Sequence, residues 1–299
     1  MIFLCKKKST NAICIISVLF LLFSGCNLNG DDVQETDDLL LLDGDFELYR
    51  ISEMGELENP TNGLVLVEQS DSLQNSNQQG YIIGHYYGKD RDIVLPQFAS
   101  DGTPIIGIGK WAFSGATDLQ SVVIPDGYQY VFSNAFTGLK KLSSVYIGKS
   151  MEYISGGDVF MECDSLENIE VDNANPYYYS VDNCILHRET MRLIVGGCNS
   201  HIPDGTKIIG STAFYSRSHH DSVLIPSTVE KIEAFAFGLC ESTSFFIDEN
   251  VTTVDSSAFV RCKNAKFFCE SPQRPAEWDE YWLSNSENAT IAWDFHKKE

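Results

Sequence analysis

The stretch Ile225-Pro226-Ser227-Thr228-Val229-Glu230-Lys231-Ile232-Glu233-Ala234-Phe235-Ala236-Phe237-Gly238-Leu239-Cys240 is one copy of a degenerate unit that recurs across about two thirds of the sequence. Aligned on the Ala-Phe pair, with Val replacing Ala once, the copies place phenylalanines 23, 24, 54, 23 and 22 residues apart, at Phe113, Phe136, Phe160, Phe214, Phe237 and Phe259. A second marker, Ile-Pro or a degenerate form of it, keeps the same period. A fixed period of this length is typical of stacked repeats, so the sequence predicts a solenoid.

Each copy suggests one coil. A run such as 119–124 has Leu-x-x-Val-x-Ile spacing, which predicts a short strand with alternate residues turned inward. Pro125, which has no N–H to continue a ladder, ends that strand. A second short extended run follows, and then Ala-Phe in a short helical or irregular turn. Ala leaves room for the chain to bend inward and Phe fills the core, so successive phenylalanines are expected to stack along the solenoid axis.

The fold expected is therefore a β-rich repeat array of about seven or eight coils, with a parallel sheet and short helical turns, over residues 93–269. Strand-like runs at 64–67 and 81–87 predict an antiparallel hairpin that caps the first coil, within residues 63–92. Repeat arrays need such caps because a terminal unit otherwise exposes its apolar face.

The first 25 residues have the pattern of an export signal: Lys6, Lys7 and Lys8 precede an apolar run at 12–23 that is too short to span a membrane. The end of this segment, Leu22-Phe23-Ser24-Gly25-Cys26, resembles the bacterial lipobox, with Phe23 where Leu is usual. The resemblance implies that Cys26 is lipidated. An ordinary cleaved signal with an incidental Cys is the alternative. Residues 26–62 are acidic and predict a flexible tether, with or without a signal for surface export.

The pattern Leu-x-x-Val-x-Ile-Pro, then Ile-Gly-x-x-Ala-Phe-x-x-Cys, resembles the BspA-type leucine-rich repeat of bacterial surface proteins. The resemblance covers about residues 64–293, and it implies adhesion to host or matrix proteins or to other cells, without catalysis. Residues 173–200 resemble the β-hairpin that interrupts many members of this family, and they account for the 54-residue gap. Residues 270–299, which carry Trp278, Trp282 and Trp293, resemble the family's Trp-rich C-terminal cap. With the lipobox, the expected location is the cell envelope of a bacterium, on the cell surface, through a lipid anchor that lies in the outer membrane if the cell is Gram-negative.

Charge and motifs narrow the classes of function. The formal net charge of −21 argues against nucleic acid and against docking on an anionic membrane surface. Motifs for structural zinc, nucleophilic hydrolysis and phosphate binding are missing from the sequence, and His219-His220 is a lone loop cluster. We therefore expect no enzyme, metal or cofactor. Cys163, Cys240 and Cys262 share one repeat position and are expected to be buried thiols, whereas Cys184 and Cys198 flank the insert and could pair.

The outward positions of the strands are the candidate binding site. If Val122 and Ile124 point inward, their neighbours point out, and one outward column is largely apolar or aromatic: Val123, Tyr146, Glu170, Leu224, Phe246 and Phe268. An exposed aromatic stripe on the sheet of a solenoid favours binding of a protein ligand, by what we expect to be a monomer. A glycan-binding accessory lipoprotein is the alternative function. Cross-strand packing that only stabilises the sheet is the alternative for the stripe.

Overall fold

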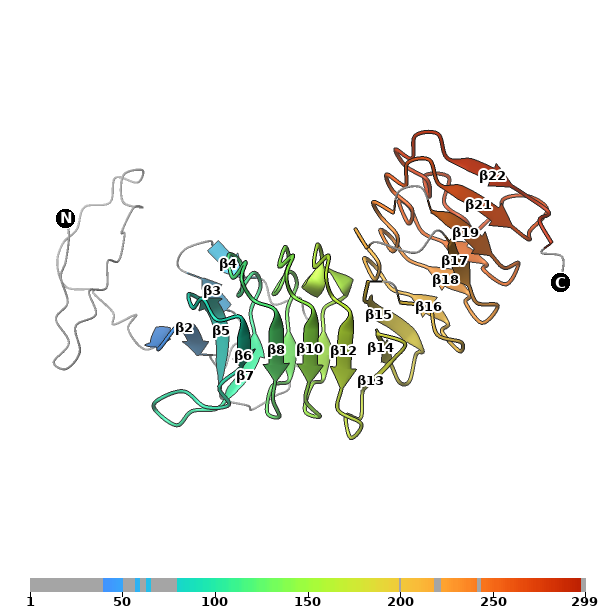
Figure 1. Cartoon of the computed structure of the whole chain (residues 1–299). Helices are drawn as coiled ribbons and strands as arrows, with labels where there is room; N and C mark the ends of the chain where they lie inside the picture. The colour runs from blue at the N-terminus through green and yellow to red at the C-terminus, as the bar shows by residue number, and fades with distance from the viewer. Residues whose placement is uncertain are drawn as a thin grey trace, which may run out of the picture. The chain divides into compact units, whose positions relative to one another are not determined.

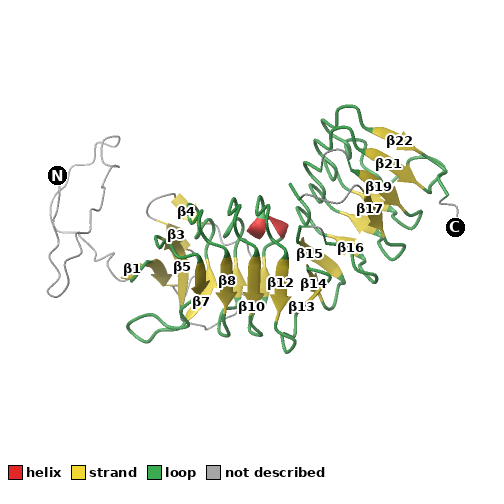
Figure 2. Cartoon of the chain, in the orientation of Figure 1, coloured by secondary structure: helices red, strands yellow, loops and turns green. Residues whose placement is uncertain are grey.

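The computed structural model describes residues 40–50, 57–59, 63–65, 80–198, 200–217, 222–240 and 243–296. The expected signal segment, Cys26 and the first part of the expected tether lie outside these ranges, as do His219 and His220. The described chain is built almost wholly of short strands and turns (Figures 1 and 2). The predicted β-rich solenoid with parallel sheets is confirmed.

Two parallel ladders run through the coils before the insert. The first has the order β12-β10-β8-β6 and is formed by β6 (Asp92–Val94), β8 (Ser121–Ile124), β10 (Ser144–Ile147) and β12 (Asn168–Val171). The second is formed by the second short extended run of each coil and contains β7 (Ile105–Ile108), β9 (Tyr130–Val131) and β11 (Tyr153–Ile154). In the first ladder Val122 pairs with Val145, and Val145 with Ile169, so the 23- to 24-residue period sets the register.

The coils after the insert repeat this plan. One ladder has the order β17-β19-β21-β22, formed by β17 (Ser222–Ile225), β19 (Ser244–Ile247), β21 (Lys266–Cys269) and β22 (Thr290–Ala292). The other contains β16 (Ile208–Ile209), β18 (Lys231–Ile232) and β20 (Thr253–Val254). Strands of two to four residues suffice because those inside each ladder are paired on both sides by equivalent strands.

The predicted phenylalanine stack lies in the core. Ring centroids are 4.6 Å apart between Phe113 and Phe136 and 5.3 Å apart between Phe136 and Phe160. After the insert, Phe237 stacks on Phe214 at 5.2 Å and on Phe259 at 5.1 Å. All six rings are fully buried, and burial of each contributes about 1.5–3 kcal/mol. The buried side chains form two main clusters, one on each side of the insert.

The turns that carry Ala-Phe are less helical than expected. Within the described ranges one short 3-10 helix, η2 (Gly157–Phe160), occupies this position. In five other coils the residue before Ala-Phe has a positive φ of 57–61°, at Trp111, Asn134, Thr212, Phe235 and Ser257. A left-handed residue cannot continue a right-handed helix. These coils therefore turn their chain through one left-handed residue instead of a helical turn.

The N-terminal cap differs from the predicted hairpin. β5 (Tyr81–Tyr86) pairs antiparallel with β2 (Phe46–Arg50), which itself pairs with β1 (Leu40–Asp43). The run at 64–67 contributes β4 (Gly63–Val65), which pairs with β3 (Leu57–Asn59) in a separate two-stranded sheet. The prediction of a flexible tether is therefore wrong for residues 40–50. Their acidic composition concealed Leu48, whose side chain is fully buried in the core.

The insert is a three-stranded meander of β13 (Tyr178–Val181), β14 (Cys184–His187) and β15 (Arg192–Gly196). Its last strand pairs parallel with β16, so the predicted hairpin also starts the second ladder of the later coils. A Cβ at Gly196 would collide with the ring of Phe214, which explains a glycine at the end of β15. Within the described ranges Cys184 and Cys198 are free, buried thiols, as are Cys163, Cys240 and Cys262.

The last coil is closed by tryptophans. The Trp278 side chain is 1% exposed, and its Nε1 donates to the carbonyl oxygen of Val251 at 2.9 Å. Trp282 packs edge-on against Phe259 and Phe267, with centroids 5.6 and 5.1 Å apart. These rings cover the end of the core that the last repeat would leave exposed. The same region also adds β22 to the sheet, so the solenoid continues into the residues expected to form only a cap.

Candidate functional site

The outward side chains of the sheet β12-β10-β8-β6 form a column in register. Val94 lies beside Val123, Val123 beside Tyr146, and Tyr146 beside Glu170. The alternate residues Val122, Val145 and Ile169 are buried, so the pleat turns the column outward. We call Val94, Val123, Tyr146 and Glu170 the first column. Val94 belongs to it although the repeat pattern did not single it out.

The remaining candidate residues lie on a different sheet. Leu224, Phe246, Phe268 and Ala292 are neighbours across β17, β19, β21 and β22, and we call them the second column. Strands β12 and β17 belong to separate sheets, with the meander of the insert between them in the sequence. The structure therefore brings the six predicted residues together as two columns, not as one continuous stripe. The 54-residue gap revealed the insert, but the period alone did not show that the sheet is divided there.

The second column is the more aromatic one. Phe246 and Phe268 stack with centroids 4.9 Å apart and an angle of 13° between their planes. Phe295 tilts over both rings, 4.8 Å from Phe268 and 5.9 Å from Phe246. Its backbone amide donates to the carbonyl oxygen of Cys269 at 3.0 Å, which fixes the end of the chain beside β21. Next to this trio, the Leu224 side chain is 61% exposed.

Tyr146 gives the first column a polar group. Its hydroxyl donates to Oδ2 of Asp172 at 2.8 Å, and this bond raises the pKa of Tyr146 to about 12. The pKa of Asp172 is lowered, chiefly by the amide of Ala174 and then by Tyr146. Nearby, Lys149 pairs with Asp126 at 2.8 Å, and this partner lowers the pKa of Asp126. The neutral hydroxyl of Tyr146 thus donates to the ionised carboxylate of Asp172, and this bond holds the ring across the end of the strand.

Beside each of these two columns runs a column of side chains that are small or polar. It contains Asp92, Ser121, Ser144 and Asn168 on one sheet, and Ser222, Ser244, Lys266 and Thr290 on the other. Among the described residues no group of three or more His, Cys, Asp or Glu side chains could hold a metal ion. In the same ranges no helix is long and apolar enough to cross a membrane.

The thiols do not add reactive chemistry to this face. Burial raises the pKa of Cys163 and of Cys184 to about 12, and burial raises the pKa of Cys198. Cys163 and Cys262 donate from Sγ to the carbonyl oxygens of Phe136 and Phe237, at 3.1 and 3.0 Å. Protonated, buried thiols behave as small apolar side chains. They belong to the core of the coils.

Two ladders of short parallel strands, a stacked phenylalanine core and a constant coil length define a leucine-rich repeat solenoid. The chain belongs to the BspA type leucine rich repeat region family, whose model matches six copies over residues 97–189 and 198–290, more than half of the chain. The family indicates a protein-binding or surface role and a surface or exported protein, and its members are generally not enzymes. A comparison with curated proteins finds no match.

Solved structures of leucine-rich repeat proteins are similar to this chain. One from Eubacterium ventriosum is 15% identical with a TM-score of 0.47, over 72% of this chain and 73% of that one. The pneumococcal vaccine antigen PcpA is 12% identical with a TM-score of 0.43, over 86% and 88%. One from Bacteroides ovatus is 15% identical with a TM-score of 0.39, over 72% and 67%.

Proposed function

We propose that this chain is a non-catalytic surface lipoprotein that binds a protein ligand through its outward columns. The observation that carries the proposal is the cluster of Phe246, Phe268 and Phe295 beside the exposed Leu224. Aromatic side chains are enriched in protein interfaces, and an exposed apolar patch on a rigid sheet is a typical interaction site. Two strands and the C-terminal segment hold the three rings, so little conformational entropy is lost when they are covered.

The neighbouring polar column supports a protein as ligand. Ser222, Ser244 and Lys266 run alongside the aromatic cluster and can donate hydrogen bonds to a partner. A rim of polar groups around an apolar centre is the usual composition of a protein interface. The first column offers a smaller version, in which Tyr146 lies between Val123 and Glu170. Glycan binding is the competing function, because aromatic rings also stack on sugar faces.

The experiment compares binding of purified extracellular matrix proteins and of a glycan array by the wild-type chain and by a variant with Tyr146→Ser, Phe246→Ser and Phe268→Ser. We expect matrix-protein binding that the triple variant loses at least tenfold. Tyr281→Ser is the matched control, because Tyr281 is 62% exposed and lies off both columns. Binding that a still-folded triple variant retains would contradict the proposal, and binding confined to the glycan array would replace the protein ligand with a sugar.

We propose further that Cys26 carries the lipid and that the acidic residues before β1 act as a spacer from the membrane. The lipobox-like residues that precede Cys26 support the first part. Incorporation of labelled fatty acid that is lost in Cys26→Ala would support the anchor, and incorporation that persists would contradict it. Proteolytic shaving of intact cells, followed by detection of the solenoid in the released fraction, tests whether the protein faces outward. Light scattering tests whether it is the expected monomer.

A further inference from the structure

One edge of the first ladder is open. β6 is the last strand in the order β12-β10-β8-β6. The carbonyl oxygen of Arg91 accepts from the amide of Ser121 at 3.1 Å, and the amide of Leu95 donates to the carbonyl oxygen of Val123 at 3.0 Å. Main-chain groups of alternate residues face opposite sides of a strand. The N–H and C=O groups of Asp92 and Val94 therefore face away from β8, where no strand of the described chain pairs with them.

The opposite edge of the same sheet is closed. On β12, the amide of Ile169 donates to Oδ1 of Asn183 at 2.8 Å, and the amide of Val171 donates to Oγ of Ser180 at 3.0 Å. Both acceptors belong to the insert. Proteins usually cover or block their sheet edges because open edges pair with other chains. The contrast between β12 and β6 indicates that the open edge is available for pairing.

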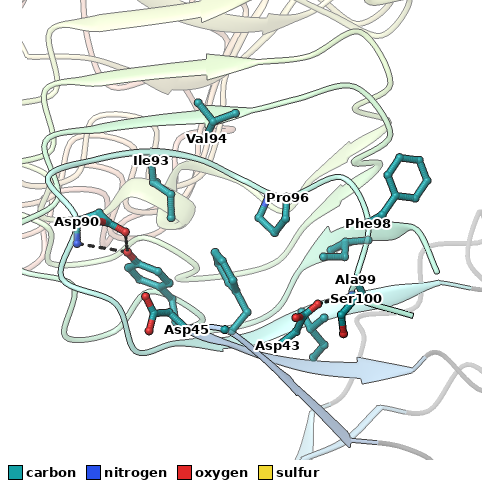
Figure 3. A pocket seen from close by; sticks show the side chains of 14 residues that line it. Asp43, Asp45, Asp90, Ile93, Val94, Pro96, Phe98, Ala99 and Ser100 are labelled. Atoms are coloured by element: carbon teal, nitrogen blue, oxygen red, sulfur yellow. Dashed lines mark hydrogen bonds between the residues drawn. The ribbon is translucent and has the colours of Figure 1, made fainter. Parts of the chain in front are cut away.

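A cleft lies beside this open edge. Its volume is about 480 Å³, enough for a large side chain, and its lining includes Phe46, Tyr86 and Ile93 (Figure 3). Two apolar side chains that also line it remain exposed to solvent: Val94 at 67% and Phe98 at 61%. The edge of β6 and this apolar cleft thus combine main-chain pairing with a place for a side chain, as in recognition by strand addition.

The cleft carries only negative charge. Asp43, Asp45 and Asp90 line it, and its lining contains no Lys or Arg. Asp43 accepts from the amide of Ser100 at 2.5 Å, and Asp90 accepts from the hydroxyl of Tyr86 at 2.7 Å, so two of the carboxylates are held in place by neutral donors. The net charge of the whole chain, −21, has the same sign. Charge complementarity therefore favours a basic occupant.

We propose that an extended, basic segment of a partner protein adds to the edge of β6 as a further strand, with an apolar side chain in the cleft and a lysine or arginine beside its carboxylates. This site goes beyond the function proposed above and does not depend on the aromatic cluster. The two can fail separately, because the triple serine variant leaves β6 intact and substitutions on β6 leave the second column intact.

The probe is a fluorescent peptide of sequence Lys-Val-Lys-Phe-Lys-Val, tested on the full chain by anisotropy at low and physiological salt. Val94→Pro removes an edge N–H without touching a bond to β8, and proline is tolerated at sheet edges. We expect it to weaken binding at least tenfold, whereas Val94→Thr, which keeps the N–H, leaves binding within twofold. Asp45→Asn is expected to weaken binding several-fold and to reduce its salt dependence, unlike Asp204→Asn, which removes an exposed carboxylate remote in sequence from the cleft.

Hydrogen exchange on the wild-type chain keeps the test valid if Val94→Pro misfolds. Bound peptide is expected to protect the amides of Asp92 and Val94, and a version with N-methylated backbone amides is expected not to. Absence of binding, binding that Val94→Pro leaves unchanged, or tighter binding of a peptide with Glu for Lys would overturn the proposal. Dimerisation that Val94→Pro abolishes, without peptide protection, would assign the edge to a second copy of this chain instead.

Discussion

Nη2 of Arg217 donates to the carbonyl oxygen of Phe160 at 2.7 Å and so links residues 57 positions apart, on the two sides of the insert. In three other coils the residue three positions after the stacked Phe is a cysteine, whose Sγ donates to the carbonyl oxygen of the preceding coil's Phe. Cys262 does so to Phe237 at 3.0 Å. Arg217 makes the equivalent bond after the insert, and its Nε also donates to Gly196 in β15 at 3.1 Å. The longer side chain of Arg217 therefore bonds at once to the coil before the insert and to the last strand of the insert.

The first prediction concerns this arginine. Arg217 is only 4% exposed, and its removal takes away hydrogen bonds from a charged donor to the buried carbonyl oxygens of Phe160, Cys163 and Gly196, each worth about 1.5–3 kcal/mol. We expect Arg217→Ala to lower the free energy of unfolding by at least about 2 kcal/mol in urea titrations. The matched control is Arg261→Ala, since Arg261 is exposed, and it should change the free energy by less than about 0.5 kcal/mol. Equal effects of the two substitutions would contradict the conclusion that the hydrogen bonds of Arg217 stabilise the connection across the insert.

The second prediction separates the core stack from the outward column. Phe136 is fully buried between two other rings, so Phe136→Ala is expected to lower the free energy of unfolding by about 3–5 kcal/mol. Phe246 is half-buried on the outward face, and Phe246→Ala should lower it by only about 1 kcal/mol. Chemical denaturation of both variants measures the difference. A cost at Phe246 as large as that at Phe136 would favour cross-strand packing as the whole purpose of the aromatic column.

The parts of the fold that the period imposes could be predicted from the sequence. The stack of Phe136 on its neighbours, the burial of Val122 and Val145 and the buried thiol of Cys262 all follow from equivalent positions in successive coils. Each such residue meets its own counterpart one coil away, so a local pattern determines a long-range contact. Six outward candidates were found in the same way, because the pleat alternates.

The rest depends on contacts that do not repeat. Phe295 lies outside every copy of the unit, and its position over Phe268 depends on how the last segment folds back along β21. The pairing of β2 with β5 joins two runs that lie more than 30 residues apart, and its only signal in the sequence was the alternation of Phe46 and Leu48 with polar neighbours. Arg217 did carry a signal, because it departs from Cys directly after the long gap. Its partners could not be read from one sequence.

The third prediction concerns the hydroxyl of Tyr146. Because the hydrogen bond to Asp172 favours the protonated phenol, the folded pKa of Tyr146, about 12, lies above the ordinary value of 10.0. Stability from this bond is therefore fully present below pH 10 and is lost as the pH rises toward 12. Carbon-13 NMR of labelled tyrosine, assigned with Tyr146→Phe, follows the titration. Asp172→Asn is expected to move the pKa of Tyr146 toward 10.0, and an unchanged value would contradict the assignment of the shift to Asp172.

The last prediction concerns the six free cysteines of the solenoid, all of which are buried. Burial raises the pKa of Cys163, Cys184 and Cys269 to about 12, so almost none of these thiols is ionised at pH 8. The thiolate is the reactive form. Brief alkylation with iodoacetamide, mapped by mass spectrometry, should label these cysteines only after unfolding in urea. Rapid labelling in the native chain would contradict their burial, whereas resistance of Cys184 and Cys198 even after unfolding, removed by a reductant, would reveal a disulfide between them. A chain whose thiols all label on unfolding, without a reductant, has no disulfide among these six cysteines.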